Sequence, residues 1–135
     1  MAAWAFRRYV TDSNRDPVKE WYDAQDDAVQ AEFDAALLIL RATKDWSRKK
    51  RVKKLTGKHR GLTEIIVNIS VRRGVRRRLR PVGIWRHEHG DFILLMGCEK
   101  KMRGSVYIPS GAFDTAMDYK TAFDAGKGSL RDHDI

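Results

Sequence analysis

The apolar positions of this chain change their spacing along its length, and the changes predict helices first and strands afterwards. Residues 4–10 alternate in a pattern of period two, which predicts a strand. From residue 16 onward the apolar residues recur every three or four positions, which marks one face of a helix. Asp16 can cap that helix and Pro17 suits its first turn. We therefore expect a first strand, then a helical pair or one bent helix that ends near Thr43.

Three apolar segments in the second half of the chain, residues 62–71, 75–85 and 91–98, have the length and spacing of a strand meander. Glycine stands in both connections, at Gly74 and Gly90, where a tight turn often needs a positive φ. The third segment is almost wholly apolar. We expect it to be the central strand of a sheet that is covered on both faces.

The region after Pro109 predicts a short C-terminal helix, because apolar residues recur there at helical spacing. Residues 126–135 begin with glycine, lysine and serine, and we expect a flexible tail there. Together the elements predict one α+β domain, residues 1–125. Its N-terminal helices would pack on one face of a mostly antiparallel twisted sheet, and the other face would be left for a ligand.

The charge of the chain is concentrated in its middle. The net charge is +9, and residues 41–103 alone hold 20 Lys and Arg against 5 Asp and Glu. Such an excess favours a polyanionic partner, because neutralised phosphates release their counterions. The alternative is a solvated basic surface that only aids solubility.

Nothing in the sequence indicates a membrane or an oxidising compartment. Cys98 is the single cysteine, so it cannot form an internal disulfide. The first ten residues lack the apolar core of a signal peptide, and no apolar run is long enough to span a bilayer. We expect a soluble, cytoplasmic protein.

Three arginines, Arg76, Arg78 and Arg80, alternate with Arg77 and Leu79 within one predicted strand. Alternate residues of a strand share a face and lie about 7 Å apart, so the three guanidinium groups would form a row. Such a row can clamp successive phosphates, because the arginine fork binds phosphate in a bidentate manner. The alternative is an edge strand that carries charge to prevent aggregation.

Histidines and the cysteine offer weaker candidates. The turn at residues 87–89 reads His-Glu-His, but no second pair of ligands accompanies it, so a plain surface turn is favoured and no metal or cofactor is expected. His59 could act as an acid or base, or be an exposed histidine without a role. Cys98 has the apolar neighbours of a core residue. The chain has no nucleophile elbow and no phosphate-cradling glycine loop.

Five blocks of the sequence, in this order and spacing, resemble the RelE/ParE superfamily of toxins, and most closely its HigB-like branch of phage-derived toxins. The blocks read DPVKEWY from residue 16, KKLTG from 53, GLTEI from 61, LRPV from 79 and DFILLMGCEKK from 91. The resemblance implies a RelE-like fold and the toxin of a type II toxin–antitoxin system. Such a toxin is a ribosome-dependent mRNA endoribonuclease that inhibits translation, needs no metal or cofactor, and is silenced by a helix-turn-helix antitoxin.

The resemblance also implies roles for individual residues. The RNA 2′-hydroxyl would attack the adjacent phosphate, and Arg80 would stabilise the phosphorane. Glu64 would be the general base or would orient Arg80. Tyr107 would be an acid or base whose pKa is lowered by nearby cations, or would only pack at a strand-to-helix junction. Lys101 completes the catalytic set by holding phosphate, and the RNA-binding residues would be Lys53, Lys54, Arg76, Arg78, Lys100 and Arg103.

Two other functions remain open at this point. ParE-like relatives of the same fold inhibit gyrase, although they typically lack so dense a basic sheet. A catalytically silent nucleic-acid-binding module is the other possibility. It is supported by Ile66, which stands where the family usually has Arg or Lys.

Overall fold

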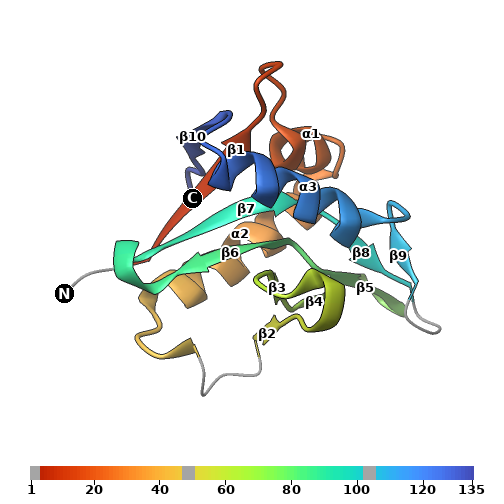
Figure 1. Ribbon diagram of the computed structural model, residues 1–135. Coiled ribbons are helices and arrows are strands. Elements are labelled where there is room, and N and C mark those ends of the chain that lie inside the picture. Colours follow the sequence, from red (N-terminus) through yellow and green to blue (C-terminus); the bar gives the residue numbers. More distant parts are fainter. Residues whose placement is uncertain (1–3, 47–50, 102–105) are drawn as a thin grey trace.

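The computed structural model describes residues 4–46, 51–101 and 106–135 (Figure 1). The helices of this part of the chain are α1 Pro17–Asp23, α2 Asp27–Ala42 and α3 Ala112–Asp124, with short 3₁₀ turns at Gly57–His59 and His87–His89. Its strands are β1 Ala5–Val10, β2 Val52–Lys54, β3 Thr63–Ile65, β4 Val67–Arg72, β5 Val75–Leu79, β6 Val82–Arg86, β7 Asp91–Met96, β8 Glu99–Lys100, β9 Tyr107–Ile108 and β10 Ser129–Asp132. None of the described helices has the length and apolar character needed to cross a membrane.

The strands form two sheets, which makes the protein an α+β protein as the sequence predicts. The larger sheet has the strand order β10-β1-β7-β6-β3-β2, and only its β1–β7 pair is parallel. The smaller sheet, β4-β5-β8-β9, is antiparallel throughout. The predicted helical pair and the C-terminal helix are confirmed, and Asp16 caps α1 by accepting a hydrogen bond from the Lys19 backbone at 3.2 Å.

A strand of one sheet leads directly into a strand of the other at three places, which together we call the seam: Ile66, Arg80-Pro81 and Gly97-Cys98. The predicted strands 62–71 and 75–85 are therefore each split in two. Pro81 has no N–H to donate to a ladder, so the pairing partners change at this position. The neighbouring Arg80 N–H donates to Cys98 O at 2.7 Å, and Ile65 N–H donates to Pro81 O at 2.8 Å.

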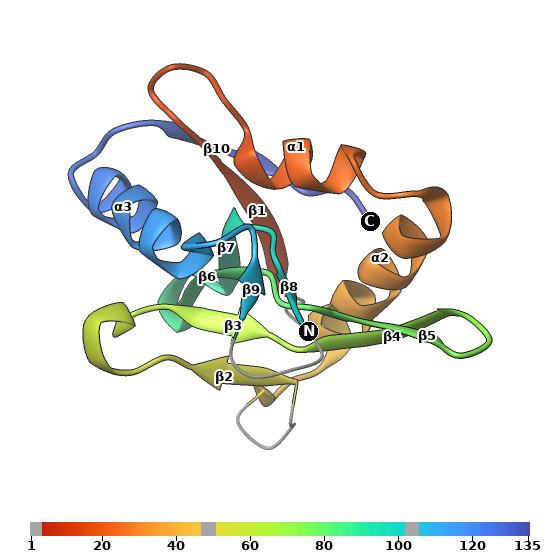
Figure 2. The same ribbon diagram turned by 90° about the vertical axis from the view of Figure 1, so that its right-hand side faces the viewer.

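Helices cover both faces of the larger sheet. Figure 2 shows α1 and α2 on one side of β1 and β7, and α3 on the other. The N-terminal helices pack on one face as predicted, but the prediction that the other face is left for a ligand is wrong for the larger sheet, because α3 covers it. The reason lies in β7, where Phe92 and Leu94 belong to the core under α1 and α2, while Ile93 and Leu95 belong to the core under α3. A strand with apolar side chains on both faces needs cover on both, so the prediction of a doubly covered central strand is confirmed.

The prediction of a flexible tail at 126–135 is also wrong, because Ser129–Asp132 form β10. This strand pairs antiparallel with β1, and Leu130 lies opposite Tyr9. Beyond the strand, His133 N–H donates to Phe6 O at 2.8 Å. The backbone groups on the outer edge of β1 would otherwise be unpaired, and β10 satisfies them.

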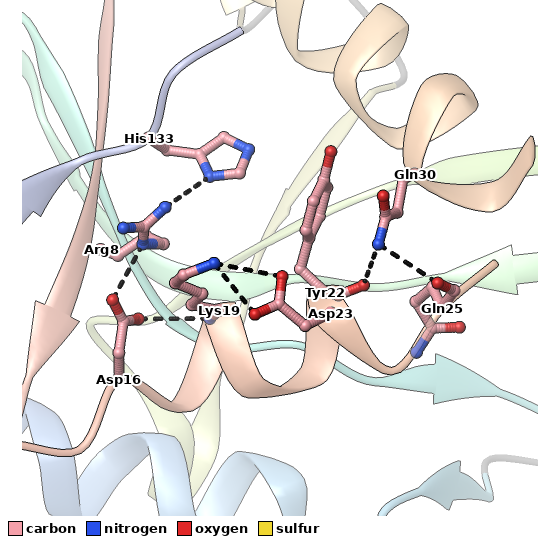
Figure 3. Close-up of polar contacts among 8 residues, drawn as sticks. All are labelled: Arg8, Asp16, Lys19, Tyr22, Asp23, Gln25, Gln30 and His133. Carbon is pink, nitrogen blue, oxygen red and sulfur yellow. Dashed lines mark hydrogen bonds and ion pairs between the residues drawn. The ribbon is translucent and has the colours of Figure 1, made fainter. Parts of the chain in front are cut away.

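A polar network fixes the C-terminal segment to the first helices (Figure 3). Arg8 lies between Asp16, at 3.1 Å, and His133 Nδ1, at 3.3 Å. The other ring nitrogen of His133 lies 3.0 Å from Asp34 Oδ1 on α2, and the imidazole is buried. Groups on β1, α1, α2 and the C-terminal segment thus hold one another in place.

One close approach joins α1 to the seam. Gly97 has no side chain, and a Cβ built there would overlap the indole ring of Trp21. Glycine at position 97 therefore lets α1 pack directly against the backbone between β7 and β8.

Candidate functional site

Glu64 is the centre of the candidate site. It lies in the middle of β3, and only 4% of its surface is exposed. Burial raises the pKa of this carboxyl, and the positive charges of Arg80, Lys53 and Lys100 and a hydrogen bond with the Tyr107 phenol oppose the rise. Among the described residues, nothing hydrogen-bonds to its Oε2 atom. A buried, electron-rich oxygen thus lies next to three cations and a phenol.

The strand registers explain how groups so distant in sequence come together. In the larger sheet Lys53 lies opposite Glu64, so both side chains share one face. In the smaller sheet Arg78 lies opposite Lys100, which in turn lies opposite Tyr107. The two rows meet at the seam.

Arg80 lies in the seam itself, between β5 and β6. It is 7% exposed, and burial lowers the pKa of its guanidinium while the Glu64 carboxylate raises it. Arginine starts from so high a pKa that it stays cationic. Its guanidinium is held by one hydrogen bond from Nη1 to Leu79 O, at 2.8 Å, within the described part of the chain. The remaining donors of this guanidinium have no hydrogen-bond partner among the residues that the structure describes.

Tyr107 corrects one expectation. We expected nearby cations to lower the pKa of this phenol, but it is raised, chiefly by burial and then by the negative charge of Glu64, against which Arg80 acts in the lowering direction. Its ring packs on Phe113 of α3 with the centroids 4.5 Å apart. The residue therefore packs at the strand-to-helix junction and also hydrogen-bonds with Glu64. It keeps its proton at neutral pH.

The predicted arginine row is present only in part, because β5 carries Arg76 and Arg78 whereas Arg80 lies beyond its end, buried in the seam. Arg76 is exposed, and Arg78 donates a hydrogen bond to Lys101 O. Arg77 points to the other face, where it forms a bidentate ion pair with Glu99, at 3.0 and 2.6 Å. Arg76 is therefore available on the open face, Arg78 is half-buried there with its Nε atom left without a partner among the described residues, and Arg77 is a structural residue.

Polar partners on β4 extend this open face, and the sequence analysis missed them. Asn68 lies opposite Arg78 and Ser70 lies opposite Arg76, and both are exposed. The signal was present in the sequence, because Asn68 and Ser70 alternate with apolar residues in the same period-two pattern as the arginines.

Two of the predicted residues lie elsewhere. Lys54 is on the opposite face of β2 from Lys53, with its ammonium 5.5 Å from the centroid of the Trp85 ring. Lys101 joins the site through its backbone: its N–H donates to Val106 O at 2.8 Å, and its carbonyl accepts from Arg78. Its side chain is exposed and does not contribute to the charges that act on Glu64. Arg103 lies outside the described residues.

His59, His87 and Cys98 make other contacts. His59 Nε2 lies 2.7 Å from Asp114 Oδ1, and His87 packs against Trp85 with the centroids 4.0 Å apart. In the described part of the chain, no three His, Cys, Asp or Glu side chains are grouped closely enough to hold a metal ion. Burial raises the pKa of the Cys98 thiol to about 12, and the thiol donates to Arg80 O at 2.9 Å. Cys98 is therefore a buried residue that supports the backbone of Arg80.

Comparisons with protein-family models, with curated proteins and with solved structures gave no match.

Proposed function

We propose that this protein is an endoribonuclease with a RelE-like fold, which cleaves mRNA on the ribosome. One observation carries the proposal: a buried carboxyl whose pKa is raised lies beside three cations and a protonated phenol, where the two sheets meet. A general base works best when its pKa is close to the working pH, and burial moves Glu64 in that direction. Perturbed carboxyls of this kind are concentrated at functional sites.

The site has groups for each step of RNA cleavage by its own 2′-hydroxyl. Glu64 takes the hydroxyl proton, and the 2′-oxygen forms a bond to phosphorus. Arg80 stabilises the extra negative charge of the phosphorane, with Lys100 and Lys53 in support. As the bond from phosphorus to the 5′-oxygen breaks, Tyr107 can give that oxygen a proton. The products are a 2′,3′-cyclic phosphate and a 5′-hydroxyl.

The open face of the smaller sheet supplies contacts for the flanking nucleotides. Arg76 and Arg78 offer guanidinium forks to phosphates, and Asn68 and Ser70 offer neutral hydrogen bonds. Of the Lys100-Lys101 pair, which the resemblance assigns to holding phosphate, Lys100 takes this role, because its charge acts on Glu64.

The toxin role rests on the five sequence blocks that resemble the RelE/ParE superfamily. By that resemblance, we propose that the protein inhibits translation and is silenced by a helix-turn-helix antitoxin. An acidic segment of such a partner would suit the basic face, because the central part of the chain carries a large excess of Lys and Arg.

Induction of the gene in a bacterium, with mapping of mRNA 5′ ends, tests the proposal. Wild type should arrest growth and produce new mRNA ends, whereas Arg80→Ala and Glu64→Ala should do neither. Arg73→Ala is the matched control, because Arg73 is an exposed arginine in the turn between β4 and β5. It should behave as wild type.

Two outcomes would contradict the nuclease. Growth arrest with intact transcripts and broken DNA would favour a gyrase inhibitor. Absence of arrest, together with RNA binding that weakens steeply with salt, would favour a silent nucleic-acid-binding module.

A further inference from the structure

Next to the candidate site lies a pocket of about 470 Å³, between the loop around His59 and the start of α3. Its walls include the rings of Tyr107 and Phe113 and the side chains of His59 and Asp114. The volume is within the usual range for small-molecule sites. Tyr107 belongs to both places, since its phenol hydrogen-bonds with Glu64 while its ring lines the pocket. A group bound in the pocket would therefore be a direct neighbour of a phosphate bound beside Glu64.

The walls of the pocket are aromatic. The Tyr107 and Phe113 centroids are 4.5 Å apart, and the His59 ring lies edge-on to Phe113 at 5.5 Å. Flat aromatic walls suit a flat aromatic ligand, and every nucleobase has a face that can stack on such rings.

The rim of the pocket has a carboxylate that can read the edge of a base. His59 and Lys58 both contact Oδ1 of Asp114, at 2.7 and 3.3 Å, and lower the pKa of this carboxyl. The contacts of Asp114 within the described residues leave its Oδ2 atom without a partner. A carboxylate can only accept hydrogen bonds, so it selects an edge that carries donors.

We propose that this pocket binds the nucleobase next to the scissile phosphate and prefers a base with an amino group, which means adenine, guanine or cytosine over uracil. Phe113 provides the stacking surface and Asp114 accepts from the amino group. The inference rests on the proposed function, because it takes the strand held beside Glu64 to be RNA. It adds a determinant of cleavage specificity that lies outside the charged cluster.

Binding of uncleavable RNA tests the pocket separately from catalysis. The probes are 2′-O-methyl hexamers of adenine, cytosine or uracil, which lack the attacking hydroxyl, and affinity is measured by fluorescence anisotropy. Wild type should bind the adenine and cytosine hexamers about five-fold or more tightly than the uracil hexamer, a ratio in the range of one stacked, hydrogen-bonded base.

Two variants should abolish this preference in different ways. Asp114→Asn can both donate and accept, so the uracil hexamer should bind as well as the others. Phe113→Leu keeps an apolar side chain but loses the stacking surface, so it should bind all three hexamers about equally and more weakly. Asp118→Asn is the control and should keep the wild-type preference, because Asp118 is an exposed carboxylate of the same helix that does not line the pocket.

If wild type binds all three hexamers equally, or if Asp114→Asn and Phe113→Leu keep the wild-type preference, the inference is wrong. Thermal unfolding of each variant excludes misfolding as the cause of a change. If the preference is present but the protein cleaves no mRNA, the inference about the pocket is supported and the nuclease proposal is wrong.

Discussion

The two sheets of this protein differ in how they are covered, and the difference separates stability from function. The larger sheet is covered on both faces, by α1 and α2 on one and α3 on the other. The smaller sheet buries one face, where Val67, Ile69 and Leu79 join the core beside α2. Its other face is exposed and carries the polar and cationic side chains. We infer that the larger sheet contributes most of the stability and the smaller sheet most of the ligand contacts.

The surroundings of Glu64 combine contributions from both sheets. The larger sheet supplies the burial that raises the pKa of this carboxyl. The chain around the seam and the smaller sheet supply Arg80, Lys100 and Tyr107. Neither sheet alone provides both a low-polarity environment and a ligand-facing cluster of cations.

Substitutions that create a cavity should lower the free energy of unfolding by different amounts in the two sheets. This is the largest change in stability that we expect. Leu94→Ala, in the centre of β7, should lower the free energy of unfolding by about 2–5 kcal/mol. Ile69→Ala, in β4 of the smaller sheet, should cost less, because Ile69 is slightly exposed and lies in a sheet that is covered on one face. Urea denaturation followed by circular dichroism measures both. An equal or larger loss for Ile69→Ala would contradict the comparison.

Glu64→Gln should lower activity and raise stability together. Loss of the general base should slow cleavage about 10²-fold or more. Because the pKa of Glu64 is raised by folding, the carboxylate form costs stability above that pKa, and the cost is relieved as the pH falls through it. Glutamine has no charge, so the variant should have the higher Tm at neutral pH, and the difference should shrink as the pH is lowered.

Thermal unfolding between pH 4 and 8 and cleavage assays with purified ribosomes measure these effects. The acidic limb of wild-type cleavage should lie above the ordinary range of a glutamate, because the base must be deprotonated to act. A lower Tm for Glu64→Gln at neutral pH would show that the three cations outweigh burial and would contradict the assignment.

Arg76→Ala and Arg78→Ala should weaken RNA binding while Arg77→Ala should not. Each lost phosphate contact should reduce the slope of log K against log salt by about 0.7 for single-stranded RNA. Arg77 is in the same strand but pairs with Glu99 on the buried face, so its loss should lower Tm and leave the slope unchanged. Titrations at several salt concentrations measure the slopes. Equal slopes for all three variants would show that the exposed face does not bind RNA.

His133→Ala should have the smallest effect, and it should be local. The imidazole links Arg8 to Asp34, so its removal should cost about 1 kcal/mol and loosen β10 against β1. Hydrogen exchange should become faster at the amides of β10 and remain unchanged in β5. Uniformly faster exchange would show that the network supports the whole fold instead.

Local periodicity predicted those features that depend on neighbouring residues. The helical pair, the doubly covered β7 and the alternation of Arg76 and Arg78 with Arg77 are all consequences of side-chain spacing along one segment. Such spacing shows which residues share a face. It does not show which other segment will cover that face.

The errors arose where distant segments meet. Leu130 of β10 pairs with Tyr9, which is near the other end of the sequence. The local sequence, with glycines at 126 and 128, therefore could not predict this strand. The pKa of Tyr107 depends on burial under α3, and cations counted along the sequence could not predict that burial. Lys53 and Lys54 are neighbours in the sequence, as are Lys100 and Lys101, so the sequence alone could not distinguish the members of each pair. The strands bring the charges of Lys53 and Lys100 close to Glu64.

The contact of Gly97 with Trp21 limits which amino-acid substitutions this protein can accept at these two positions. Any residue with a side chain at position 97 must displace the Trp21 ring, which packs α1 against the sheet, or bend the backbone that leads to Lys100. In a library with all twenty amino acids at this position, glycine alone should be recovered from a selection for activity. Substitutions that enlarge position 97 would be tolerated only with a smaller residue at 21, so these two positions should vary together or not at all.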